Sequence, residues 1–262
     1  MFCSKLRSHC IMITDPLFYL VATPAVLLMG LSKGGFAGLG LMSLPLMALV
    51  ISPVQAAAIM LPILITQDVV TVWAYRHSWD GRNLAILLPG AALGIGLGYL
   101  LASRVSDAAV ALAVGVISIA FAMRRLVAER RGAPAPMRPG VVSGLFWGVV
   151  CGFTSMIAHA GGPPFQVYVL PQRLARDIFV GTGAVLFAAI NWIKLPPYVA
   201  LGQFTRENLL TSAALFPLAV LATWLGVLLV RRISGERFYT AIYILLILVG
   251  LKLVWQGARA VL

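Results

Sequence analysis

The stretch Trp79-Asp-Gly-Arg-Asn83-Leu84 returns later in the chain as Phe204-Thr-Arg-Glu-Asn208-Leu209, at an offset of 125 residues (204 − 79). Further matches at an offset of 128 (217 − 89, 232 − 104) pair Pro89 with Pro217 and Arg104-Val-Ser106 with Arg232-Ile-Ser234. Each match adjoins an apolar stretch. Two membrane halves built from one ancestral unit are typical of secondary transporters, whose substrate binds where the repeats meet. The repeat therefore predicts transport before any single residue is considered.

The composition of the chain indicates a lipid environment. Of its 262 residues, 61% are hydrophobic and 11% are charged, and the mean hydropathy is +0.96. Soluble domains average about 45–50% apolar and about 25% charged residues. Because one globular core cannot hide such an apolar excess, the sequence predicts an all-α polytopic integral membrane protein with the lipid bilayer as a partner.

The net charge of +12 does not indicate nucleic-acid binding. The basic residues lie mainly in short gaps between apolar runs and form no stripe that could follow a nucleic-acid backbone. Lys and Arg are retained on the cytoplasmic side of membrane proteins, so their first use is to set the topology. An anionic substrate would be a second reason for the basic excess.

Neither the cysteines nor the N-terminus changes this assignment. The three cysteines have no metal-type spacing, and no metal, other cofactor or catalytic residue is expected. Lys5, Arg7 and His9 precede an apolar stretch at 17–31, but no cleavage site follows it. The stretch is therefore expected to be a retained first membrane helix rather than a signal peptide.

Ten apolar segments are expected, two of them too short to cross a bilayer. They fall at 17–32, 36–50, 53–75, 83–103, 106–124, 141–158, 162–172, 175–200, 208–230 and 236–256. A spanning helix takes about 20 residues. The short segments 36–50 and 162–172 follow Gly-rich breaks at matching places in the repeat, which predicts broken or re-entrant helices that frame a binding site.

The chain divides into a first repeat at 1–126, a basic, Pro-rich linker at 127–140 and a second repeat at 141–262. With the linker placed in the cytoplasm, the loops richer in Lys and Arg fall inside. The loop at Arg82 is then inside and its repeat partner at Arg206 outside, which predicts inverted repeats with about eight to ten membrane segments. In the alternative, two halves of the same orientation would place Arg231 and Arg232 outside.

The first break, residues 30–40, contains five glycines and Lys33. Glycines let helix ends approach closely and leave backbone N–H groups available, and helix N-termini favour anions. Ser32, Lys33, Gly34 and Gly35 are therefore predicted to bind an anionic substrate. Alternatively, Lys33 is a membrane-surface anchor and the glycines only serve packing.

The second break occupies the equivalent place in the other half. Thr154 and Ser155 could donate hydrogen bonds to an oxyanion, His159 could do so or take up a proton, and Gly161 and Gly162 precede two prolines that suit a new helix start. These five residues are predicted to bind substrate. Alternatively, His159 is an interfacial residue without a role in transport.

Polar residues also interrupt two otherwise apolar helices at similar points of the repeat. Gln67 and Asp68 lie within 53–75, and Asn191 and Lys194 lie within 175–200. Charges inside a membrane are costly and usually functional. Asn191 is predicted to contact substrate, and Gln67, Asp68 and Lys194 to serve proton coupling or charge pairing, with Asp68 paired to Lys33 or Lys194. The alternative is a structural ion pair or hydrogen bond.

Four features of the chain occur together: the Gly30–Gly40 run with Pro45, the Gly161-Gly162-Pro163-Pro164 run with Pro171, the repeated Asn-Leu helix start, and Asn191. In combination they resemble the TauE/SafE family of sulfite-exporter-like permeases. The resemblance covers essentially the whole chain. It implies a multi-pass protein of the bacterial inner membrane that transports small sulfur-containing anions such as sulfite or organosulfonates.

The leading hypothesis is thus a secondary transporter that exports a small anion. Because no nucleotide-binding motif is present, a proton or substrate gradient is expected to drive this transport. A homodimer is one option for its assembly. A passive anion channel is one alternative. An intramembrane hydrolase is another, because Ser155 and His159 are four residues apart and would share a helix face.

Overall fold

The computed structural model describes residues 12–36, 38–102, 106–131, 139–229 and 236–261, and every regular element in these ranges is a helix. The all-α prediction is therefore confirmed. The α-helices are α1 (Pro16–Gly34), α2 (Ser43–Met47), α3 (Pro53–Ala74), α4 (Gly81–Ala102), α5 (Asp107–Arg131), α6 (Val141–Ala158), α7 (Gly162–Val169), α8 (Arg176–Ala200), α9 (Arg206–Leu229) and α10 (Glu236–Val261), and two 3₁₀ turns are η2 (Leu39–Met42) and η3 (Leu170–Gln172).

Several helix starts follow from local sequence signals. Asp15 caps α1 by accepting a hydrogen bond from the N–H of Leu17 at 2.9 Å, and Ser52 caps α3 in the same way. A proline occupies the first turn of each helix, where its missing N–H costs nothing. The repeated motif also marks equivalent starts, because α4 and α9 begin 125 residues apart (206 − 81).

Six helices in the described part of the chain are long and apolar enough to cross a membrane: α1, α3, α4, α6, α8 and α9. The helices α5 and α10 are long as well but carry more charged residues. The helix α7 has eight residues, about 12 Å at a rise of about 1.5 Å, which is well short of a hydrocarbon core of about 30 Å. Additional crossings and re-entrant segments remain predictions.

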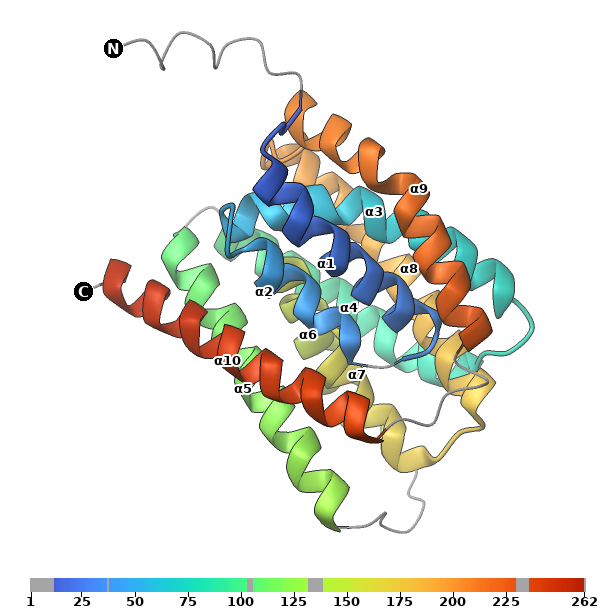
Figure 1. Ribbon diagram of the computed structural model, residues 1–262. Coiled ribbons are helices and arrows are strands. Elements are labelled where there is room, and N and C mark those ends of the chain that lie inside the picture. Colours follow the sequence, from blue (N-terminus) through green and yellow to red (C-terminus); the bar gives the residue numbers. More distant parts are fainter. Residues whose placement is uncertain (1–11, 37, 103–105, 132–138, 230–235, 262) are drawn as a thin grey trace, which may run out of the picture.

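The helices pair across the two halves of the sequence. In Figure 1, α1 lies along α9 and α5 lies along α10, and the other main pairs are α4 with α6 and α3 with α8 and α9. The most buried spanning helix is α3, with 61% of its apolar window inside the protein against 33% for α9. The centre of the molecule is therefore at the crossing of α3 and α8.

Glycines line the two closest helix contacts. A Cβ atom added at Gly34 of α1 would lie 2.3 Å from the carbonyl carbon of Gly226 on α9. A Cβ added at Gly94 of α4 would lie 2.0 Å from the carbonyl oxygen of Val149 on α6. Small residues at helix contacts let backbones approach closely in membranes. Part of the glycine content is thus explained by packing.

The division into two repeats and a linker stays a prediction, and part of the linker is helical. Helix α5 continues to Arg131, so the linker's first residues are helical. The rest of the linker at 132–138 lies outside the described residues, as do Arg104 and Arg231–Ser234.

Candidate functional site

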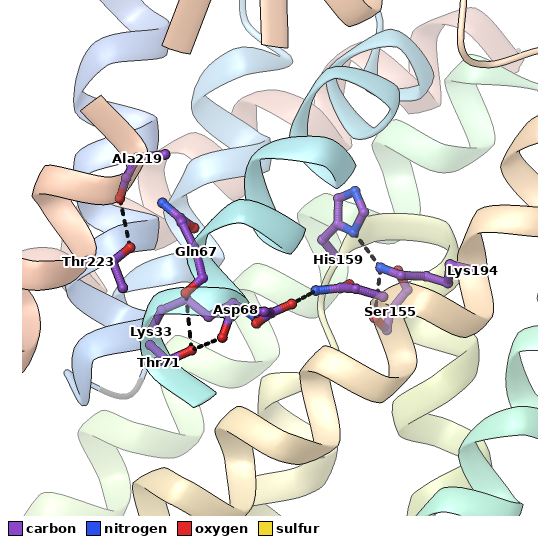
Figure 2. Close-up of polar contacts among 10 residues, drawn as sticks. Lys33, Gln67, Asp68, Thr71, Ser155, His159, Lys194, Ala219 and Thr223 are labelled. Carbon is purple, nitrogen blue, oxygen red and sulfur yellow. Dashed lines mark hydrogen bonds and ion pairs between the residues drawn. The ribbon is translucent and has the colours of Figure 1, made fainter. Parts of the chain in front are cut away.

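The first break in the sequence is the C-terminal end of α1. Lys33 lies in the last turn of this helix, and its ammonium group forms an ion pair with the carboxylate of Asp68 on α3 (Figure 2). The Lys33 side chain is 11% exposed and that of Asp68 is 3% exposed. Lys33 also lies over the ring of Phe187, 5.4 Å from its centre. The lysine points into the protein and is no membrane-surface anchor.

Asp68 uses both carboxylate oxygens. One accepts from Lys33, and the other accepts from the side-chain amide of Asn191 on α8 at 2.6 Å. Removing a charge from water is costly unless the charge is paired and its remaining lone pairs are satisfied. The sequence left open whether Asp68 pairs with Lys33 or with Lys194. In the structure it pairs with Lys33.

The second break is the C-terminal end of α6. His159 ends this helix in a left-handed conformation, with φ of 50°, and its N–H donates to the carbonyl of Ser155. The chain then turns into α7, whose first turn holds Pro163 and Pro164. Both breaks therefore bring a helix C-terminus, with its partial negative charge, into the interior.

Lys194 on α8 meets the end of α6 with three acceptors around its ammonium group. Its Nζ lies 3.2 Å from the carbonyl oxygen of Ser155, 3.2 Å from the Ser155 hydroxyl and 2.8 Å from Nδ1 of His159 (Figure 2). Three acceptors match the three N–H donors of a protonated lysine. Lys194 thus places its amine at a helix C-terminus, where a positive charge is favoured.

The surroundings of His159 fix its tautomer. Its Nε2 lies 2.8 Å from the carbonyl oxygen of Ala57, which can only accept, so Nε2 carries the proton. Nδ1 is then the acceptor for Lys194. Because both ring nitrogens are bonded elsewhere, and Ser155 has no bond to the ring, the Ser–His pair lacks the arrangement of a nucleophile and its base.

A cavity of about 120 Å³ lies beside these two clusters. Its polar lining residues are Ser32, Lys33, Ser155, His159, Gln166 and Asn191. Its apolar lining includes Met29, Leu41, Leu64, Phe165, Phe179 and Phe187. Lys33 lies in this lining and pairs with Asp68, whereas Lys194 lies behind the lining residues Ser155 and His159. A pocket with few polar groups and two basic side chains in or behind its lining suits a small anion.

Several predicted residues line this cavity, namely Ser32, Lys33, Gly35, Ser155, His159, Gly162 and Asn191. Asp68 and Lys194 touch the lining residues through the bonds described above. Gly34 does not line it, because it packs on α9, and Gly161 contacts Cys151 and Phe187. Gln67 is buried and its amide donates to the carbonyl of Val26 at 3.4 Å, without a side-chain bond to Asp68.

Two predicted donors are already occupied. The N–H of Gly35 donates to the carbonyl of Ser32 at 3.1 Å, because the chain reaches the first break as the end of a helix and not as its start. The prediction of a free Gly35 amide was therefore wrong. The Thr154 hydroxyl lies 2.8 Å from the carbonyl of Val150 and 3.0 Å from that of Ala160, so it is also bonded within the second break.

Gln166 and a cluster of phenylalanines also line the cavity but were not among the predicted residues. Phe165 lies 5.4 Å from Phe179 and 5.6 Å from Phe187 between ring centres. Gln166 is the single amide within the apolar stretch of α7, and the argument that identified Asn191 within α8 would have applied to it. The phenylalanines carry no comparable signal, because aromatic residues are common in any apolar segment.

A comparison with known protein families gave a match over most of the chain. The family described as "Sulfite exporter TauE/SafE" matches residues 22–253, nearly the whole chain. The chain belongs to the TauE/SafE family. It is therefore a multi-pass membrane protein of an exporter-type transporter family. A comparison with curated proteins and one with solved structures each gave no match. In the described part of the chain, no group of three His, Cys, Asp or Glu side chains could hold a metal ion.

Proposed function

We propose that this TauE/SafE protein is a secondary transporter, an exporter of a small sulfur-containing anion such as sulfite or an organosulfonate, in the bacterial inner membrane. The observation that carries the proposal is the cavity beside two helix ends, where Lys33 lies in the lining and pairs with Asp68, and Lys194 bonds to the lining residues Ser155 and His159. A bound anion would complete the charge balance of these groups.

The Lys33–Asp68 pair offers a mechanism for proton coupling. An anion that binds the Lys33 ammonium competes with Asp68 for the same charge. The Asp68 carboxylate, buried and held by Asn191, would then lose its counter-ion and bind a proton instead. Anion and proton would thus occupy the site together, so that movement of one would be coupled to the gradient of the other. Lys194 would supply a fixed positive charge.

The packing of helices from one half on helices from the other half is compatible with an alternating-access mechanism. The first-half helix α1 packs on the second-half helix α9, and the second-half helix α6 packs on the first-half helix α4. This reciprocal pairing supports two related repeats that rock against each other, with α2 and α7 as re-entrant segments next to the site. An inverted orientation of the repeats is part of the same proposal.

The deciding test is transport of labelled sulfite into proteoliposomes, with and without an imposed proton gradient. Saturable uptake that the gradient drives against a sulfite concentration difference is expected. Flux that never saturates and ignores pH would favour the passive channel instead. Lys33→Ala is the matched variant, and we expect it to insert normally and to reduce flux at least ten-fold. Normal flux through Lys33→Ala would remove this lysine from the site.

A serine-reactive probe tests the intramembrane hydrolase. Ser155 accepts a hydrogen bond from Lys194, and both nitrogens of His159 are bonded elsewhere. We therefore expect no covalent labelling of Ser155. Labelling that is lost in Ser155→Ala would contradict the transporter as the sole activity of this site.

A further inference from the structure

Helix α8 presents a regular stripe of residues to the cavity. Phe179, Gly183, Phe187 and Asn191 follow one another at intervals of four residues, and all of them line the cavity. Residues at this spacing are neighbours on one face of a helix. At a rise of about 1.5 Å per residue, the stripe extends about 18 Å along α8. The cavity can therefore be described by what it meets from one end of this stripe to the other.

The stripe is polar at its C-terminal end. The side-chain amide of Asn191 donates to Asp68, the ion-pair partner of Lys33. One turn before Asn191, the ring of Phe187 lies beside the Lys33 ammonium group, 5.4 Å from the ring centre. The charged group of an anion bound to Lys33 would thus lie at the level of Phe187 and Asn191.

The stripe is aromatic at its N-terminal end. The ring of Phe165 on α7 lies 5.4 Å from that of Phe179 and 5.6 Å from that of Phe187, between ring centres. Val180 and Ala184, which flank the stripe, also line the cavity. None of these side chains carries a hydrogen-bonding group, so an oxyanion placed among them would lose water without replacement. An apolar group would instead gain free energy from burial there.

The volume of the cavity leaves room for such a group. The cavity measures about 120 Å³. An engineered apolar cavity of about 150 Å³ holds benzene, which is larger than sulfite. A sulfur oxyanion at Lys33 would therefore leave space for a short alkyl group beside it.

We propose that the site selects sulfonates that carry a short alkyl group, with the sulfonate at Lys33 and the alkyl group among the phenylalanine rings. This inference rests on the proposed function and narrows its substrate class, since sulfite would fill only the polar end. Gly183 is the specificity-determining position. A Cβ atom added there would lie 3.3 Å and 3.4 Å from two ring carbons of Phe165. Gly183→Ala would thus fill space at the aromatic end.

Three sulfonates that bear the same single negative charge provide the test. In proteoliposomes, we would measure the inhibition constants of methanesulfonate, ethanesulfonate and 2-hydroxyethanesulfonate against uptake of labelled sulfite, and the uptake of labelled ethanesulfonate itself. Ethanesulfonate should bind about four-fold more tightly than methanesulfonate, the effect of burying one further methylene group. The hydroxyl of 2-hydroxyethanesulfonate would leave water for apolar surroundings, so this anion should bind less tightly than ethanesulfonate.

Two glycine variants locate the alkyl group. Gly183→Ala should remove the preference for ethanesulfonate over methanesulfonate, because the added methyl group takes up space at the aromatic end. Gly96→Ala on α4 is the matched control and should keep the preference, since nothing lies within 4 Å of its added Cβ atom.

Three outcomes would count against these inferences. Ethanesulfonate binding no tighter than methanesulfonate to the wild-type protein would overturn the selectivity without any variant, so poor folding of Gly183→Ala cannot obscure the result. An unchanged preference in folded Gly183→Ala would show that the alkyl group binds elsewhere. Absence of saturable uptake of both sulfite and ethanesulfonate would overturn the proposed function itself, which the first two outcomes leave standing.

Discussion

In both halves of the molecule a helix ends in the interior beside a polar residue of a central helix, but the charges are placed differently. In the first half the lysine, Lys33, is on the broken helix α1 and the carboxylate, Asp68, is on α3. In the second half the lysine, Lys194, is on α8, and the end of α6 offers only the neutral acceptors of Ser155 and His159.

We propose that this difference gives the two clusters separate roles in transport. The first cluster is an ion pair that an anion can disturb, because a competing anion exchanges one partner of Lys33 for another. The second cluster holds a cation with neutral groups and a helix C-terminus, so its charge has no exchangeable carboxylate partner. Under this proposal, the first half would serve coupling, and the second half would supply a constant positive potential.

The largest expected effect comes from Lys33→Met. It leaves the Asp68 carboxylate buried without a counter-ion, and removal of one partner of a buried pair costs about 3–5 kcal/mol. Sulfite flux should fall at least ten-fold. Thermal unfolding in detergent measures the stability. The double variant Lys33→Met, Asp68→Asn should recover most of the stability but not the flux, and recovery of flux would show that the pair is only structural.

A smaller loss of stability is expected for Asp68→Asn. The Lys33 that remains lines the cavity and is 11% exposed, so water can reach its ammonium group more easily than it reaches Asp68. The informative readout is the pH dependence of sulfite flux, which this variant should flatten. His159→Gln is the comparison in the second cluster and should keep the wild-type profile. An unchanged profile in Asp68→Asn would remove Asp68 from coupling.

For Lys194→Met we expect a still smaller loss of stability, about 1–3 kcal/mol, because only neutral acceptors lose their donor. The half-saturating concentration of sulfite should rise while the pH profile keeps its shape. A stability loss as large as that of Lys33→Met would mean that the second cluster also contains a paired charge, and the contrast between the halves would fail.

A loss of stability similar to that of Lys194→Met is expected from changes in helix packing, in which the two halves are alike. Gly94→Ala and Gly34→Ala should each cost about 1–3 kcal/mol, because the added Cβ atom would meet the backbone of the partner helix. Gly96→Ala is the control, since nothing lies within 4 Å of its added Cβ, and it should be neutral or slightly stabilising. If Gly94→Ala behaved like Gly96→Ala, the close contact between α4 and α6 would not contribute to stability.

The helices could be predicted from the sequence because the residue patterns that mark them are local. Apolar runs of about 20 residues between Gly and Pro breaks predict spanning helices, and the structure places them within a few residues of the predicted ranges. The repeated Asn83 and Asn208 motif marked two equivalent helix starts for the same reason. Asp68 and Lys194 were recognisable because a charge within an apolar helix needs a compensating partner.

The sequence by itself thus determined a helical membrane protein with polar residues at a few points of its interior. It did not determine which lysine pairs with Asp68, because the pairing depends on how α1 and α8 cross α3. It also could not place Gln166, which lines the cavity only because of the way in which α7 packs. Tertiary structure decided both, since contacts between helices far apart in the sequence depend on packing geometry rather than on local pattern.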